Sequence, residues 1–136
     1  MELIRQKIAK VKEYMTYIED LGKDCDKKFT IDPVYRGALL YYLYLMADTC
    51  IVLAEMVIKK RDLRHPQSYS DAFDILGDYE ILDKEFAYSF AKIAGFRNFL
   101  AHDYEKIDAQ KICQAILRKL PDVKIFLQQL QKTLNI

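Results

Sequence analysis

The sequence predicts an all-α fold: a bundle of four to five helices with an up-and-down core and a kinked or divided last helix. Only 4 glycines and 3 prolines occur in 136 residues, which favours long helices over a β fold with many turns. Apolar residues recur with the helical period in several segments, and no segment alternates convincingly like a strand. The length and a hydrophobic content of 51% suit one folded domain, residues 1–136.

The first helix is expected to run from the N-terminus to about the lysine pair Lys27–Lys28. Its apolar residues follow one another at alternating spacings of four and three, so they share one helical face. These residues are Ile4, Ile8, Val11, Met15 and Ile18.

A second helix is expected to start at Asp32-Pro33, because Asp caps free amides and Pro suits the first helical position. One face carries Leu39, Leu43, Met46, Cys50, Leu53 and Val57. The other sides are apolar too, with Leu40, Tyr41, Tyr42, Tyr44 and Leu45. A helix that is apolar on several sides must be buried by more than one neighbouring element. Two interpretations stay open: it is surrounded by its own domain, or one face contacts a second copy of the chain.

Residues 38–58 are apolar enough to raise the question of a membrane span. Asp48 and Glu55 lie inside this run, and charged side chains are costly within a bilayer. We therefore expect a core helix and no membrane partner. The N-terminus, with charges among its apolar residues, does not have the pattern of a signal peptide.

A connector and a short helix are expected next. Residues 59–70 are polar and contain Pro66, as is typical of a connector. Ser70 is expected to cap a helix over residues 71–76, and Gly77 to end it.

Two further helices complete the predicted bundle. One starts at Asp83 and carries an apolar stripe of Phe86, Phe90, Ile93 and Leu100. The last starts at Asp108, and Pro121 should kink or divide it near Leu120.

The three cysteines, Cys25, Cys50 and Cys113, are odd in number and widely spaced, without a CxxC pair. This pattern predicts neither a zinc site nor a disulfide framework. We expect reduced thiols in a cytoplasmic protein.

The net charge is +1, so any binding of nucleic acid would need a local patch of cations. One candidate is Lys59, Lys60, Arg61 and Arg64 in the connector, which could hold RNA phosphates. The other interpretation is a solvated helix C-terminus, where cations suit the helix dipole.

The segment 96–104 carries the candidate chemistry. Arg97 falls in phase with the apolar stripe, and a cation there must be paired or line a polar cleft. Asn98 and His102 are four residues apart and share a helical face. Arg97 lies five residues before His102, a rotation of roughly 140° on a regular helix. Both side chains could flank one phosphate only if the helix end frays or a second chain contributes.

These residue types suit cleavage of RNA by internal transesterification, a reaction that needs no metal. Histidine titrates near neutrality and can move the proton of the 2′-hydroxyl or of the leaving group. Arginine can bind a phosphate with two N–H groups and stabilise its developing charge. From spacing alone, structural roles for Arg97 and His102 remain the alternative. Asp48 could pair with Arg97, orient His102, or be a buried polar group satisfied by a tyrosine.

The same segment resembles the signature of HEPN toxins of the HepT type. Arg97, His102 and Tyr104 form Arg-x4-His-x-Tyr, with the polar Asn98 directly after the arginine. The likeness extends over nearly the whole chain. It includes Pro66-x-x-Tyr69, Ala72-Phe73-x-x-Leu76, Ala94-Gly95-Phe96-Arg97-Asn98 and Asp48 in its apolar stretch.

The resemblance implies a HEPN-like bundle that forms a homodimer with two motifs facing each other in a cleft. It implies the toxin of a type VII toxin–antitoxin system, a metal-independent endoribonuclease that needs no cofactor. Arg97 and His102 would be catalytic, with Asn98, and in part Asp48, supporting them. The cognate partner would be a minimal nucleotidyltransferase (MNT) antitoxin that transfers AMP to Tyr104. The alternative is a catalytically silent HEPN subunit that binds nucleotide or RNA for the nucleotidyltransferase.

Overall fold

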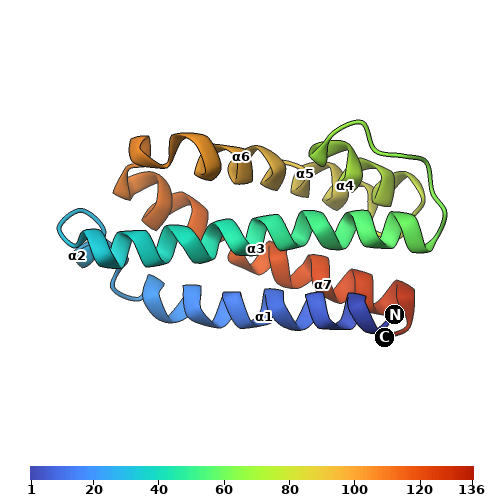
Figure 1. Cartoon of the computed structure of the whole chain (residues 1–136), viewed down its shortest axis with the longest axis horizontal. Helices are drawn as coiled ribbons and strands as arrows, with labels where there is room; N and C mark the ends of the chain where they lie inside the picture. Colours follow the sequence, from blue (N-terminus) through green and yellow to red (C-terminus); the bar gives the residue numbers. More distant parts are fainter.

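The computed structural model describes residues 1–136, apart from the side chain of Tyr104. The described residues fold as helices and connecting turns, as the sequence predicts (Figure 1). The elements in chain order are α1 (Glu2–Gly22), α2 (Cys25–Lys28), α3 (Pro33–Lys60), α4 (Tyr69–Asp78), α5 (Lys84–Phe90), α6 (Ile93–Asp103), the 3₁₀ turn η1 (Tyr104–Lys106), the π-helical η2 (Gln110–Ile116), the 3₁₀ turn η3 (Leu117–Lys119) and α7 (Leu120–Leu134).

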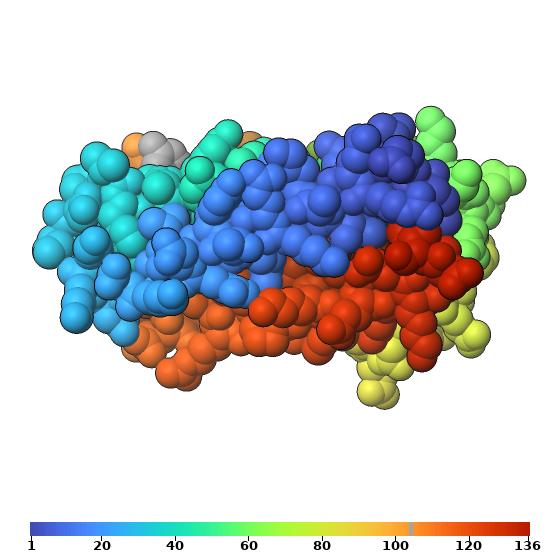
Figure 2. All heavy atoms as spheres, turned by 90° about the horizontal axis from the view of Figure 1, so that it is seen from below, coloured from blue at the N-terminus to red at the C-terminus, as the bar shows by residue number. Residues whose placement is uncertain are grey.

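The helices run up and down along the long axis of the molecule, with α3 at the centre (Figure 1). On one side α3 packs against α1, and on the other against α4 and α6. The last helix, α7, returns beside α1, so the two chain ends lie at the same end of the bundle (Figures 1 and 2). An ion pair of 3.0 Å joins Lys124 of α7 to Glu19 of α1.

Helix α1 buries the five apolar residues of its predicted face. It ends at Gly22, however, and the pair Lys27–Lys28 belongs to the separate turn α2. The C-terminal end of α1 is bound by a residue of another helix. The hydroxyl of Tyr35 on α3 donates a hydrogen bond to the carbonyl of Leu21. The last carbonyls of a helix lack partners within the helix, and a long-range donor of this kind is not visible in local spacing.

Helix α3 starts where the sequence predicts. The amide of Tyr35 donates to Oδ1 of Asp32 at 3.1 Å, and Pro33 occupies the first turn. The helix is long and apolar enough to cross a membrane, but half of its most apolar window is buried inside the bundle. Its six-residue predicted face, from Leu39 to Val57, is buried, so α3 has the burial of a core helix.

Helix α4 differs from its prediction at both ends. Ser68, and not Ser70, is the N-cap, because its hydroxyl accepts the amide of Asp71 at 3.0 Å. The helix also continues past Gly77, which faces α5 rather than ending the helix. A Cβ at Gly77 would lie 2.8 Å from Cβ of Ala87, so glycine is what allows these two helices to approach so closely.

The single helix predicted from Asp83 is two helices in the structure. Asp83 does cap the first, accepting the amide of Phe86 at 3.1 Å. The chain then turns at Ala91 and Lys92, where the amide of Lys92 bonds to the carbonyl of Ser89 at 3.3 Å. The stripe continues across this turn, because Phe90 and Leu100 are both buried.

The last helix is divided, as predicted. Asp108 starts it by accepting the amide of Lys111 at 2.7 Å. The turns of η2 and η3 follow, and regular α-helix begins only with Pro121 in the first turn of α7. Phe126 of α7 stacks on Phe90 at 4.9 Å between ring centroids, which joins this helix to the core.

Cys25 of α2 and Cys113 of η2 form a disulfide, with their Cα atoms 5.6 Å apart. The expectation of reduced thiols is therefore wrong for this pair. The two cysteines are 88 residues apart, and only the packing of η2 against the end of the bundle brings them together. Cys50 is a buried free thiol, and burial raises its pKa far above the usual range, so it is not a nucleophile.

We expect this disulfide to stabilise the fold, because it closes a loop of 88 residues and so restricts the unfolded chain. Reduction, or a Cys113→Ser substitution, should lower the free energy of unfolding by about 4 to 5 kcal/mol. Urea denaturation with and without a thiol reductant measures the difference. The Cys113→Ser protein is the control and should not respond to the reductant. Identical unfolding of the oxidised and reduced natural sequence would contradict this expectation.

Candidate active site

Arg97 projects from α6 towards α3 and is paired there. Its Nε–H donates to Oδ1 of Asp48 at 3.0 Å, with 18% of the Arg97 side chain and 37% of the Asp48 side chain exposed. The charge that interrupts the apolar stripe of α6 thus meets the charge that interrupts the apolar run of α3. A cation and an anion that pair in this way avoid the cost of lone charges in a partly buried place.

Two tyrosine rings enclose the guanidinium group of Arg97. Its central carbon lies 5.2 Å from the ring centroid of Tyr44 on α3 and 5.2 Å from that of Tyr69 at the start of α4. A cation over an aromatic face is attracted by the ring. Nη2 also donates to the hydroxyl of Tyr44 at 3.1 Å, and Nη1 donates to Oδ1 of Asn98 at 3.2 Å.

This arrangement leaves part of Arg97 free to bind a ligand. A guanidinium group has five N–H donors, and Asp48, Tyr44 and Asn98 take three of them. Among the described residues no acceptor takes the other two, one on each terminal nitrogen, so each can donate to an oxygen of a ligand such as phosphate. Because the side chain is held on several sides, little further ordering is needed when a phosphate arrives.

The surroundings of Arg97 also keep it charged. Burial lowers the pKa of the guanidinium group, but the hydrogen bond to Asp48 and the nearby Tyr44, Asp48 and Tyr69 outweigh this effect. The pKa is therefore raised above its ordinary value. Arg97 can act as a permanent positive charge and not as an acid or base.

The structure does not bring His102 to Arg97 within one chain. His102 and Asn98 are both exposed, one turn apart on α6. Helix α6 continues through His102 to Asp103, so it does not fray between Arg97 and His102. No hydrogen bond or ion pair joins Arg97 to His102 in the part of the chain that the structure describes.

Tyr104, the predicted site of AMP transfer, begins the turn η1 directly after α6. Its side chain lies outside the described residues, so its role as the site of AMP transfer stays a prediction.

The predicted RNA-binding cations lie at the far end of α3. Lys59 and Lys60 are exposed, and Arg61 ends the helix, donating from Nη2 to the carbonyl of Thr133 at 3.3 Å. Lys60 lies twelve residues beyond Asp48, about 18 Å along a regular helix. These cations can therefore reach only a phosphate distant from the one that Arg97 would hold.

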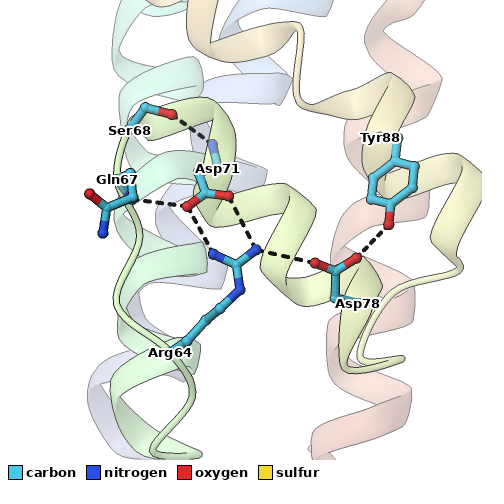
Figure 3. A network of polar contacts seen from close by, with 6 residues as sticks. All are labelled: Arg64, Gln67, Ser68, Asp71, Asp78 and Tyr88. Atoms are coloured by element: carbon cyan, nitrogen blue, oxygen red, sulfur yellow. Dashed lines mark hydrogen bonds and ion pairs between the residues drawn. The ribbon is translucent and has the colours of Figure 1, made fainter.

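Arg64 is engaged within the chain (Figure 3). It forms ion pairs of 3.1 Å with Asp71 and 3.2 Å with Asp78, and Asp78 also accepts the hydroxyl of Tyr88. The backbone amide of Gln67, followed by Arg64, lowers the pKa of Asp71 below its ordinary value. This network fastens the connector to α4 and α5 and largely compensates the charge of Arg64.

Sequence reasoning missed the two tyrosines that enclose Arg97. The sequence pattern predicts Tyr44 in the core or at an interface, and Tyr69 in the connector. A signal for Tyr44 was present, because Tyr44 and Asp48 are four residues apart and therefore share one face of α3. For Tyr69 no local signal exists, since its contact with Arg97 depends on how α4 packs.

A cavity of about 610 Å³ that is wide open to solvent adjoins the site. It is lined by Glu55, residues 66–70, Ala94, Gly95 and Asn98. No cluster of three or more His, Cys, Asp or Glu side chains suited to a metal ion occurs among the described residues. The arrangement can therefore hold an anion at Arg97 and a further group in the cavity beside it.

The chain is similar in sequence to known ribonucleases. A family model described as "Ribonuclease HepT-like" matches residues 4–130. The chain is similar to the mRNA nuclease HepT of Shewanella oneidensis, with 24% identity over 93% of this chain and 94% of that protein. It is similar to the tRNA nuclease HepT of Aphanizomenon flos-aquae, with 32% identity over 68% of this chain and 63% of that protein.

The fold is also similar to a solved structure, that of the tri-AMPylated HEPN toxin of Shewanella oneidensis in complex with an MNT antitoxin. The TM-score is 0.87 and the identity 23%, over 97% of this chain and 98% of that chain.

Proposed function

The chain belongs to the ribonuclease HepT-like family, and on that premise we propose that it is the endoribonuclease toxin of a type VII HEPN/MNT toxin–antitoxin pair. The observation that supports this most is Arg97, which is held by Asp48, Tyr44 and Asn98 and has two N–H groups without an acceptor among the described residues. We further propose that residues 1–136 form one HEPN domain. We also propose that it acts in the cytoplasm, the compartment of the proposed RNA substrate; this no longer rests on reduced thiols, because Cys25 and Cys113 form a disulfide.

The proposed reaction is an internal transesterification without a metal. Arg97 binds two oxygens of the scissile phosphate, and His102 takes the proton of the neighbouring 2′-hydroxyl. The 2′-oxygen attacks the phosphorus, and the bond from phosphorus to the 5′-oxygen of the next nucleotide breaks. That oxygen takes up a proton from water, which leaves a 2′,3′-cyclic phosphate and a free 5′-hydroxyl. Asp48 and Asn98 hold Arg97 in position.

A second copy of the chain would complete this site. Within one chain, Arg97 and His102 point in different directions from an unbroken α6. In a homodimer with facing motifs, His102 of the second copy can approach the phosphate held by Arg97. The outer side of α3 offers a contact surface next to the site, with Tyr41 58% exposed and Leu45 and Val52 half-buried.

We therefore expect light scattering at micromolar concentration to give twice the 16.0 kDa mass of one chain. A Leu45→Lys substitution should yield monomers, because it places an unpaired charge in the apolar contact. Tyr79→Lys, at a 49% exposed tyrosine on the far end of α4, is the control and should remain dimeric. A single species of 16.0 kDa for the natural sequence would contradict the proposed dimer.

RNA would be bound mainly at Arg97, with Lys59, Lys60 and Arg61 as additional contacts for distant phosphates. Arg64 would contribute less, since Asp71 and Asp78 compensate its charge.

We propose that an MNT-type antitoxin silences the toxin by transferring AMP to Tyr104. Tyr104 lies two residues from His102, and a bound AMP would bring a negative charge and a bulky adenosine to the cleft. The Tyr104→Phe variant keeps the ring and loses the acceptor oxygen, so it should fold and receive no AMP. Intact mass after co-expression with the antitoxin measures the transfer, with Tyr79→Phe as the control. AMP added to Tyr104→Phe in the usual amount would place the modification elsewhere.

Cleavage of RNA in EDTA by the purified chain, free of AMP by intact mass, tests the proposed function. We expect fragments that end in a 2′,3′-cyclic phosphate. If the RNA stays intact although the protein binds it, the chain is instead a silent HEPN subunit that holds RNA or nucleotide for its partner.

A further inference from the structure

The cavity beside Arg97 shares two walls with the site. Tyr69 lines the cavity and packs its ring against the guanidinium group. Asn98 lines it too, and accepts a hydrogen bond from Nη1 of Arg97. A molecule whose phosphate is bound by Arg97 therefore has the cavity directly next to it.

Glu55 supplies the charged group of this cavity. It is exposed, and no described residue forms an ion pair with it. Asp48 and Glu55 are seven residues apart on the same face of α3, about 10 Å along the helix axis. Asp48 is occupied by Arg97, whereas Glu55 is left facing the cavity.

The chemistry of the walls selects what the cavity can bind. A carboxylate repels phosphate, so this part of the surface does not suit the RNA backbone. It does suit the N–H groups of a nucleobase, because a carboxylate only accepts hydrogen bonds. The ring of Tyr69, which is 41% exposed, offers a surface on which a base can stack.

Guanine fits this combination best among the four bases. Its pairing edge presents two adjacent donors, N1–H and the 2-amino group, which match the two oxygens of one carboxylate. Adenine and cytosine place an acceptor nitrogen beside their amino group, and uracil has one N–H between two carbonyls. Only guanine can therefore use both oxygens of Glu55 through neighbouring donors.

We propose that the cavity lined by Glu55, Tyr69 and Asn98 is a guanine subsite, which selects the nucleotide next to the phosphate held by Arg97. Tyr69 stacks on the base, and Glu55 accepts hydrogen bonds from N1–H and the 2-amino group. This proposal rests on the proposed ribonuclease function, since it names the base that the same site recognises.

The test compares guanine with inosine, whose base lacks only the 2-amino group. Mapping of cleavage sites in an RNA of mixed sequence should show guanine enriched at one position beside the cut. Replacing that guanosine by inosine should lower kcat/KM about tenfold, as expected for a lost hydrogen bond to a charged group. In Glu55→Ala both the preference and the response to inosine should disappear, whereas Glu85→Gln, at an exposed glutamate of α5, should keep them.

The outcomes separate the two proposals. Cleavage without any base preference, or an unchanged guanine preference in Glu55→Ala, overturns the subsite and leaves the ribonuclease intact. If the natural sequence does not cleave RNA, the ribonuclease function fails, and calorimetry with the 3′- and 5′-monophosphates of guanosine and inosine decides on the subsite. Weaker binding of the inosine forms, lost in Glu55→Ala, supports it, and equal binding of all four overturns it.

Discussion

The His102→Ala variant should lose RNA cleavage by at least about a hundredfold, the lower end of what a general acid or base contributes. His102 is exposed near the end of α6, where a truncated side chain leaves no cavity, so the fold should be unaffected. Cleavage rates with a fluorescent RNA oligonucleotide measure the loss, and circular dichroism checks helical content and melting temperature.

The chain offers a matched control for this substitution, because it contains one other histidine. His65 is also exposed and lies in the connector between α3 and α4. His65→Ala should cleave RNA at the rate of the natural sequence. Full activity of His102→Ala would rule out a role for His102 in moving protons.

Replacing Arg97 by lysine should also reduce cleavage by about a hundredfold or more, as for the loss of a group that stabilises the developing charge. The positive charge is kept, but the planar group with its five donors is lost. Arg97 donates three N–H groups to described residues, and in the proposed reaction its other two bind the phosphate. The three donors of lysine sit on one nitrogen and cannot serve both purposes with the same geometry.

The fall should appear mainly in kcat, because the guanidinium group is aimed at the charge that develops in the transition state. Single-turnover rates and KM values measured together make this distinction. Arg5→Lys, on the exposed side of α1, is the control and should behave like the natural sequence. If the Arg97→Lys variant were fully active, Arg97 would contribute only its positive charge and not its planar set of donors.

Local pattern predicted the buried face of α1 and the start of α3 well. The spacing from Ile4 to Ile18 identified the buried face of α1, and Asp32-Pro33 marked the start of α3. Both signals depend on neighbours in the chain, namely the helical period and the capping of free amides. The division of the last helix at Pro121 is of the same kind, because proline cannot continue the hydrogen bonds of a helix.

The errors lie where packing between helices decides. Ser68 and Ser70 have equal capping chemistry, and it is Ser68 that caps α4 in the structure. The turn at Ala91 and Lys92 interrupts a stripe that is periodic enough for one helix. The Cys25–Cys113 bond joins segments that are 88 residues apart. For the disulfide the partner is distant in the chain, so no local spacing carries the information.

The sequence by itself determined the all-α class and the long central helix, and it identified residues 97–104 as the candidate motif. Each of these follows from the order of neighbouring residues. Only the tertiary structure decided what surrounds Arg97. It brought Asp48 and Tyr44 of α3 and Tyr69 of α4 around one guanidinium group, two of whose N–H groups have no acceptor among the described residues. It also placed a cavity and the carboxylate of Glu55 beside that group. Such contacts depend on how helices pack in space, and residues up to 53 positions apart in the chain meet there.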